Sequence, residues 1–315
     1  MLSRIAESLF WIGRYIERSD GTARILDVHL QLLLEDPWIE ENLACRSLLS
    51  VMGTEVEDDH EVSRADVLAL LAVDRNQPAS IAYSLAAARE NARAVRGTLT
   101  TEVWETQNQT WLEFNKLLAS GELKRDPANV FEWVKFRSHL SRGVAVGTML
   151  QDEAFHFVRI GSFLERADNT ARMLDVKFHD VESDFYGNAD ERDTEYEFYH
   201  WSAILRSVSG FEVYRKVYRN VIQPEKVAEL LILRPDMPRS LAACTQEVLS
   251  NLTMIANEQS SETLRRAGRL RSDLQYGRID EILATGLHAY LTQFLERVGT
   301  LGVGISRDFL VPVQS

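Results

Sequence analysis

Five residues that could carry chemistry fall on one strip of a predicted N-terminal helix. They are Gly13, Glu17, Asp20, Arg24 and Asp27. Spacings of four, three, four and three residues place them on a single helical face. Carboxylates in such a row could act as acid/base groups or as Mg²⁺ ligands, and an arginine could pair with them or with an anionic substrate. The strip therefore offers the groups for proton transfer, metal binding or ion pairing.

The same strip occurs again in the middle of the chain. Its members there are Gly161, Glu165, Asp168, Arg172 and Asp175. Residues 12–30 and 160–178 align without a gap, and 11 of the 19 positions are identical. A match of that density indicates an internal duplication, with repeats of about 1–149 and 150–315.

The retention of the strip in both copies favours a structural role. Outward neighbours differ between the copies, as with Arg14 and Ser162, whereas every strip member is kept. Charged groups at a core boundary need fixed partners, which explains such retention. In this interpretation Asp20, Arg24 and Asp27, with their equivalents Asp168, Arg172 and Asp175, form a polar network that holds each helix and joins the halves.

The alternative is a bilateral site with Glu17 and Glu165 as catalytic candidates. If the two helices face each other, six strip carboxylates meet only two strip arginines. That excess could bind Mg²⁺ or an amine, or be neutralised by a third helix. Apart from this Mg²⁺ possibility, no metal site or cofactor is evident.

Two further sets of arginines are candidates for binding a substrate. Arg18 and Arg166 follow the two glutamates and point about 100° away from them, toward another helix or solvent. Arg89, Arg93 and Arg96 share one face of a later helix, and only in the first half. Three such arginines suit carboxylate or phosphate recognition, and the alternative is that they dock onto the glutamates of the repeated helices.

Composition narrows the function classes. The chain of 315 residues has a formal charge of −12, which would repel phosphate backbones, so we expect no nucleic-acid partner. Its seven histidines are scattered, and no nucleotide-binding or nucleophile motif occurs. There is no long apolar run and no signal peptide, and its two cysteines sit in apolar surroundings, so we expect a cytoplasmic protein with no membrane association.

Helices are needed to position these residues. Proline is scarce, with seven in the chain, and no stretch alternates long enough for a confident strand. On the first helix Leu9, Ile12, Ile16, Ala23 and Leu30 form an apolar stripe beside the polar strip. The segment from Gly299, with three glycines, is expected to be loose. The main predicted helices are 3–34, 39–52, 64–72, 80–96, 107–120, 128–149, 153–179, 196–209, 211–220, 238–257, 260–274 and 279–298.

The sequence thus predicts an all-α fold. We expect a single helical domain over 1–315, built from two duplicated halves packed about a pseudo-twofold axis.

The motifs resemble those of the bacterial Alpha-E proteins, which are named for a helical domain with a Glu-Arg motif. The resemblance is carried by residues 2–18 with Thr22-Ala-Arg24, by residues 164–172 and by residues 88–93. One departure is Gly21, where similar proteins usually have asparagine. Glycine weakens a helix by up to about 1 kcal/mol.

The resemblance implies a context more than a mechanism. Alpha-E proteins are typically encoded beside circularly permuted ATP-grasp proteins and transglutaminase-like proteins, and in some cases a proteasome-like peptidase. These are the implied partners, in a pathway that makes or modifies peptide or amide bonds. The main hypothesis is an accessory or co-catalytic partner of an ATP-grasp-type ligase. The alternatives are a stand-alone enzyme acting on an acidic peptide or amide through a carboxylate/arginine site, and a non-catalytic scaffold.

Overall fold

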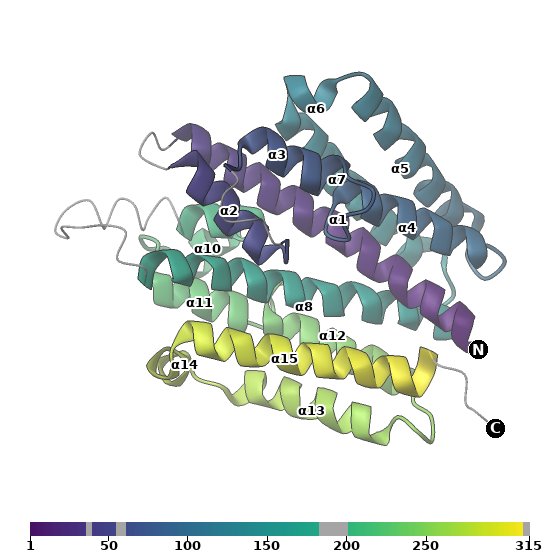
Figure 1. Cartoon of the computed structure of the whole chain (residues 1–315). Helices are drawn as coiled ribbons and strands as arrows, with labels where there is room; N and C mark the ends of the chain where they lie inside the picture. Colours follow the sequence, from purple (N-terminus) through teal and green to yellow (C-terminus); the bar gives the residue numbers. More distant parts are fainter. Residues whose placement is uncertain (36–39, 55–60, 183–200, 311–315) are drawn as a thin grey trace.

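The computed structural model describes residues 1–35, 40–54, 61–182 and 201–310 (Figure 1). In those ranges it contains helices and no strand, which confirms the all-α prediction. The helices are α1 (Ser3–Glu35), α2 (Glu41–Val51), α3 (Arg64–Leu68), α4 (Ile81–Ala94), α5 (Thr101–Ala119), α6 (Glu122–Arg125), α7 (Pro127–Thr148), α8 (Glu153–Glu182), α10 (Phe211–Tyr218), α11 (Pro224–Ile232), α12 (Leu241–Met254), α13 (Ser261–Tyr276), α14 (Ile279–Thr285) and α15 (Leu287–Ile305). Residues 201–207 are also helical, and two π-helical turns cover Ala69–Val73 and Ser306–Leu310.

The two repeated helices, α1 and α8, lie side by side in the middle of the molecule (Figure 1). The predicted apolar stripe of α1 is confirmed as core, since all five of its members are buried: Leu9, Ile12, Ile16, Ala23 and Leu30. Because these residues are three, four or seven positions apart, one face of a straight helix can bury all of them. The polar strip next to them is thereby brought to the contact with α8.

The two strip glycines mark where α1 and α8 touch. A Cβ atom on Gly13 would stand 2.1 Å from the carbonyl oxygen of Val158, and one on Gly161 would stand 2.0 Å from that of Phe10. Gly13 thus faces residues 158–162 and Gly161 faces residues 10–14, and Gly21 meets Asn169 further along both helices, so the helices run parallel and in matching register. Any side chain at either glycine would force the backbones apart.

Close packing between α1 and α8 also explains the glycine at position 21. A Cβ atom at Gly21 would approach the side-chain nitrogen of Asn169 to 2.5 Å. Asn169 is the equivalent of Gly21 in the second repeat, so the glycine of one copy makes room for the asparagine of the other. The departure from the family pattern therefore fits the parallel helix pair.

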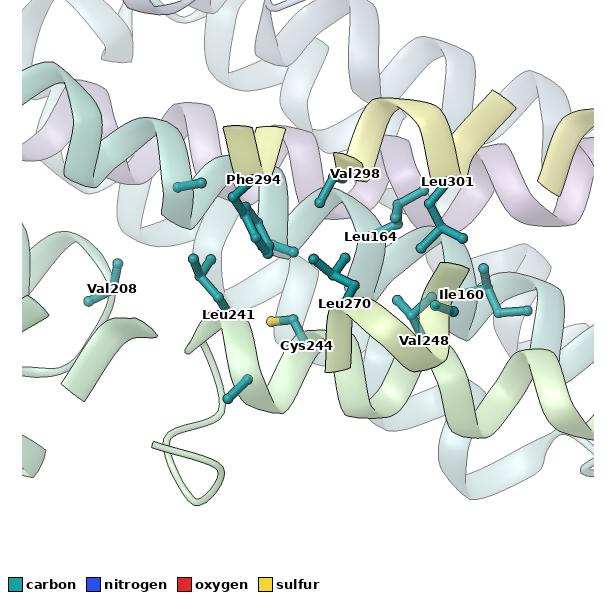
Figure 2. Packing of buried hydrophobic residues seen from close by; sticks show 14 of the residues in the cluster. Ile160, Leu164, Val208, Leu241, Cys244, Val248, Leu270, Phe294, Val298 and Leu301 are labelled. Carbon is teal, nitrogen blue, oxygen red and sulfur yellow. The ribbon is translucent and has the colours of Figure 1, made fainter. Parts of the chain in front are cut away.

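Two apolar clusters lie along α1. One combines its N-terminal half with α8, α12, α13 and α15. Figure 2 shows one residue from each of these four partner helices pointing into this cluster: Leu164, Val248, Leu270 and Phe294. The other combines the C-terminal half of α1 with α2, α3, α4, α5 and α7. Because α1 contributes to both clusters, it links the two parts of the core.

The prediction of a loose segment from Gly299 was wrong. Helix α15 continues to Ile305, and Leu301, Ile305 and Leu310 are buried. The glycines there permit close packing: a Cβ atom on Gly304 would meet the hydroxyl of Thr263 at 2.6 Å. Small residues at a helix contact explain the composition better than disorder does.

The repeats also begin two later helices alike. Ser80 caps α4 by accepting from the amide of Tyr83 at 3.0 Å, and Ser240 caps α12 by accepting from the amide of Ala243 at 2.9 Å. These local similarities accompany the duplication in sequence. Symmetry of the complete halves about a twofold axis stays a prediction.

Candidate functional site

The two repeated glutamates exchange arginines across the contact between α1 and α8. Glu17 accepts from Nε and Nη2 of Arg166, both at 2.8 Å. Glu165 accepts from Nε of Arg18 at 2.6 Å and from its Nη2 at 3.1 Å. The arginine after each glutamate therefore serves the glutamate of the other copy. Arg18 and Arg166 do point away from their own neighbours, as expected, and they join the polar network; substrate binding by either stays a prediction.

Further arginines complete the shell around each glutamate. Arg142 of α7 donates to Oε2 of Glu17 at 2.8 Å, and Arg239, just before α12, donates to Oε1 at 2.9 Å. Glu17 is fully buried among three guanidinium groups. Glu165 accepts from Nε of Arg14 at 2.5 Å in addition to Arg18. Bidentate and charge-assisted bonds of this kind satisfy buried carboxylates.

The two strip aspartates differ in their surroundings. Asp20 is fully buried, with Nη2 of Arg239 at 2.5 Å and Nε of Arg24 at 3.1 Å from its Oδ2. Its Oδ1 has no hydrogen-bond partner. Asp168 is half-buried and accepts from Nε of Arg172 at 2.7 Å, and that arginine is 44% exposed. The same motif is therefore sealed in one copy and open to solvent in the other.

The far ends of the strips carry simpler pairs. Nζ of Lys135 on α7 lies 2.8 Å from Oδ2 of Asp27. Nδ1 of His288 on α15 lies 2.6 Å from Oδ1 of Asp175. Both aspartates thus bind a basic group from another helix, which ties α1 and α8 to their neighbours.

The excess of strip carboxylates over strip arginines is neutralised from other segments, and neutralisation by a third helix was one of the expected alternatives. The strips hold six carboxylates, and the residues that pair with them are more numerous. These are Arg14, Arg18, Arg24, Arg142, Arg166, Arg172 and Arg239 with Lys135. The surplus is therefore cationic among the described residues, because arginines outside the repeated strip supply more charge than the strip's own two.

Electrostatics keep both glutamates ionised. Burial alone would raise the pKa of Glu17, but the charges of Arg166, Arg239 and Arg142 outweigh it and hold that pKa well below its usual range. Burial is likewise outweighed at Glu165, where Arg14 and Arg18 lower the pKa. A carboxylate with a low pKa and every oxygen occupied is a poor proton donor or acceptor at neutral pH. The geometry gives these glutamates a structural role.

Arg89 and Arg93 of α4, and Arg96 in the turn after it, do not reach the strip. Nε of Arg89 donates to Asn108 at 2.8 Å, and its Nη1 lies 2.6 Å from Glu90. Arg93 also pairs with Glu90, at 2.8 Å, and Arg96 is exposed. The hypothesis that these three arginines dock onto the repeated glutamates was wrong. Their role in substrate binding stays a prediction.

Sequence reasoning missed the residues that complete the network. Arg142 and Arg239 lie outside both copies of the strip, and Arg239 aligns with Ala79 in the other half. Arg14, set aside as an outward neighbour since Ser162 replaces it, binds Glu165. The available signal was therefore the opposite of repetition: basic residues present in one half only supply the missing charge.

Metal binding finds no support in this arrangement. Within the described ranges no group of three or more histidine, cysteine, aspartate or glutamate side chains could hold a metal ion. The strip carboxylates each contact a basic side chain instead, and guanidinium groups bind both oxygens of Glu17 and of Glu165. Across the same ranges, no helix combines the length and apolar character that crossing a bilayer requires.

The Glu-Arg pairs identify the family. A family model described as a predicted α-helical domain with a conserved ER motif matches residues 1–310. The chain belongs to the Alpha-E family. The exchange of Arg18 and Arg166 between the two glutamates gives this motif a physical role in an Alpha-E protein, since it joins the repeated helices.

Relatives of this Alpha-E protein occur in mycobacteria. An uncharacterised protein of Mycobacterium bovis is 25% identical over 324 residues, covering 93% of this chain and 35% of the relative. An uncharacterised protein of Mycobacterium tuberculosis is 24% identical over 324 residues, and the alignment again covers 93% of this chain and 35% of the relative. The chain therefore spans about a third of the length of these curated relatives. No solved structure matches it.

Proposed function

We propose that this Alpha-E protein is an accessory or co-catalytic partner of an ATP-grasp-type peptide or amide ligase in bacterial peptide synthesis or modification. The observation that carries the proposal is the enclosure of both repeated glutamates by arginines. A motif used in this way builds a stable helical body and leaves the bond-forming chemistry to another protein.

A stand-alone enzyme using Glu17 and Glu165 is the weaker candidate. Acid/base catalysis needs a carboxyl group with a pKa near the working pH and access to a substrate. Both glutamates are buried, and their pKa values are lowered by neighbouring arginines. A purely non-catalytic scaffold would fit the same geometry, so the ligase's rate with and without this protein separates the two accessory roles.

The length of the mycobacterial relatives supports a partnership. This chain aligns with about a third of each relative, and the remaining sequence belongs to the same polypeptide. A helical domain joined to additional sequence in one chain is expected to work next to it. By the same reasoning we propose three separate proteins as candidate partners: an ATP-grasp protein, a transglutaminase-like protein and a proteasome-like peptidase. We also propose that the protein works in the cytoplasm, because ATP is available there.

The outer face of α7 is a reasonable contact surface for such a partner. Phe136 is 65% exposed, Val146 is 54% exposed and Leu150, just after the helix, is 78% exposed. Gly143 and Gly147 lie on the same side with open space around them. Apolar side chains gathered on one exposed helix face are typical of protein contacts. A helix of the ligase would bury them closely against the two glycines.

The duplicated halves fit this role. We infer a pseudo-twofold relation between the repeats, centred on the contact of Gly13 with the 158–162 segment and of Gly161 with the 10–14 segment. Departures from that symmetry, such as Arg239 opposite Ala79, would give each half a different surface. One surface could then bind the ligase while the other stays free.

Co-expression with the neighbouring ATP-grasp protein tests the proposal. We expect the two proteins to co-purify by affinity capture and size-exclusion chromatography, and ATP turnover by the ligase to change when this protein is added. Phe136→Glu should weaken the complex, because a charge would be buried in the contact. Leu112→Glu, at an exposed apolar position of α5, is the matched control and should bind normally. No complex and unchanged ATP turnover would contradict the proposal.

A further inference from the structure

Positive charge is concentrated at one end of the polar network. Two buried carboxylates, those of Glu17 and Asp20, face more guanidinium groups than they can neutralise. Those groups belong to Arg24, Arg142, Arg166 and Arg239. Each arginine contacts one of the two carboxylates, but among the described residues four guanidinium groups against two carboxylates leave a net charge of +2 at that end. Uncompensated buried charge is costly, so a further anion there would be stabilising.

His139 sits between two of these arginines and faces solvent. Its Nδ1 lies 2.8 Å from Nη2 of Arg142, and its Nε2 lies 3.4 Å from Nη2 of Arg24. Guanidinium nitrogens only donate, whereas a neutral imidazole has one acceptor nitrogen and one N–H. One of the two contacts therefore sets a donor against a donor. Burial, followed by the charge of Arg142, lowers the pKa of His139, which keeps the ring neutral near pH 7.

Ser209, from a different segment, contacts the same arginine as His139 does. Its hydroxyl accepts from Nη1 of the buried Arg24 at 2.7 Å, and the residue itself is exposed. Its backbone has φ of 53°, in the left-handed region that non-glycine residues rarely adopt. That φ belongs to the C-terminal cap of the 201–207 helix, in which the amide of Ser209 donates to the carbonyl of Arg206 at 3.0 Å and the amide of Gly210 donates to that of Leu205 at 2.6 Å. The hydroxyl can donate to an incoming oxygen while it accepts from Arg24.

We propose that His139, Arg142 and Ser209, backed by Arg24, form a binding site for one oxyanion group, a carboxylate or a phosphate, of a small molecule or peptide. An oxygen placed between the imidazole and a guanidinium would accept from both and remove the donor–donor contact. The anion would also offset part of the surplus charge. This inference does not depend on the ligase proposal.

The second repeat does not offer this arrangement. There the equivalent arginine, Arg172, is paired with Asp168 and is 44% exposed. The position that aligns with Arg239 is Ala79, which carries no charge. The duplication therefore explains the shared network but not the cationic surplus. The site combines Arg24, whose equivalent Arg172 lacks these neighbours, with His139 and Arg142 of the first half and Ser209 of the second.

Nuclear magnetic resonance of the histidine rings in the full-length protein tests the site. Sodium phosphate and sodium acetate are titrated separately at pH 7, with sodium chloride added to hold the ionic strength constant. One histidine, identified as His139 by the loss of its signal in His139→Gln, should shift and saturate, and its pKa should rise as the anion binds. The other six histidines are internal controls. Saturation by phosphate alone assigns a phosphate ligand, and saturation by both anions or by acetate alone assigns a carboxylate.

Variants give an independent readout. Ser209→Ala and His139→Gln should each raise the anion concentration for half-maximal thermal stabilisation about tenfold, as expected for a lost bond to a charged group. Arg93→Gln removes an exposed arginine elsewhere and should leave that concentration unchanged. A His139 signal that never saturates with either anion would overturn the site. So would equal midpoints in the wild type and both variants.

Discussion

At the scale of single residues, Glu17 and Glu165 have the same position in their repeats but different surroundings. Glu17→Gln would remove the carboxylate that three guanidinium groups share and leave Asp20 alone to offset them, so we expect the free energy of unfolding to fall by about 3–5 kcal/mol. Glu165→Gln should cost less, because Arg14 and Arg18 are partly exposed and can turn to water. Urea denaturation measures both values.

Glu90→Gln is the control for that comparison. Glu90 pairs with Arg89 and Arg93 at the surface, where ion pairs contribute little, so its stability should stay close to wild type. An unchanged free energy of unfolding in Glu17→Gln, together with loss of an enzymatic activity, would favour the catalytic interpretation over the structural one.

The buried carboxylates also predict how stability depends on pH. The pKa values of Glu17, Asp20 and Glu165 are lowered in the folded chain, since neighbouring arginines outweigh the effect of burial. The folded state therefore binds fewer protons than the unfolded state in acid. Their contribution is complete above the ordinary glutamate pKa of 4.5 and is lost as pH falls below it toward the lowered values.

Urea midpoints between pH 7 and pH 3 measure this loss. The wild-type midpoint should be nearly flat near neutral pH and should decrease steeply below about pH 4.5. Glu17→Gln removes one of the three shifted groups, so its decrease should be shallower. Parallel curves for the wild type and the variant would mean that Glu17 has the same pKa in both states.

At the scale of helices, the contact between α1 and α8 depends on two glycines. Gly13→Ala places a methyl group where the carbonyl oxygen of Val158 already lies, so the helices must separate. We expect a loss of about 1–3 kcal/mol or more in the free energy of unfolding, from strained packing and from weakened Glu17–Arg166 bonds. Thermal and urea denaturation report it.

Gly268→Ala is the control for Gly13→Ala, and we expect it to change the free energy of unfolding in the opposite direction. Gly268 lies inside α13 with open space around its Cα atom. Alanine there should stabilise the protein by about 0.5–1 kcal/mol through helix propensity alone. If Gly13→Ala behaved in the same way, the close approach of α1 and α8 would be wrong.

The sequence predicted this helix pair better than the site on it. Periodicity identified the core stripe around Ile12 and Ile16, and repetition identified the strip, because both depend on spacing within one helix. The partners Arg142 and Arg239 could not be predicted in that way. Which face of α7 meets α1, and where the chain enters α12, depend on tertiary packing. Repetition also concealed Arg239, since Ala79 takes its place in the other half.

At the scale of the whole molecule, the prediction is that the chain forms one domain. The two apolar clusters along α1 are relevant to it, because they show which parts of the chain share a core. The apolar cluster at the C-terminal half of α1 contains residues of the first repeat only, between Ala23 and Val134. The cluster at its N-terminal half combines both repeats. Residues 1–149 could thus keep some local structure alone, whereas the surface of α1 that meets α8 would be uncovered.

Separate fragments 1–149 and 150–315 test this coupling. Without the second half, Leu9 and Ile12 lose their cover and Glu17 loses Arg166 and Arg239, so fragment 1–149 should expose apolar surface. We expect it to show helical circular dichroism but no sharp unfolding transition, and to bind a hydrophobic dye. Mixing or co-expressing the fragments should restore a single cooperative transition.

The Gly13→Ala change gives this experiment its control. A fragment 1–149 that carries alanine at position 13 should fail to restore the transition, because the added methyl group blocks the approach of α8. Sharp unfolding of the unmodified fragment alone, with a free energy near that of the full chain, would contradict a single domain. The two repeats would then be independent units, and the exchange of arginines between Glu17 and Glu165 would join them without being needed for either to fold.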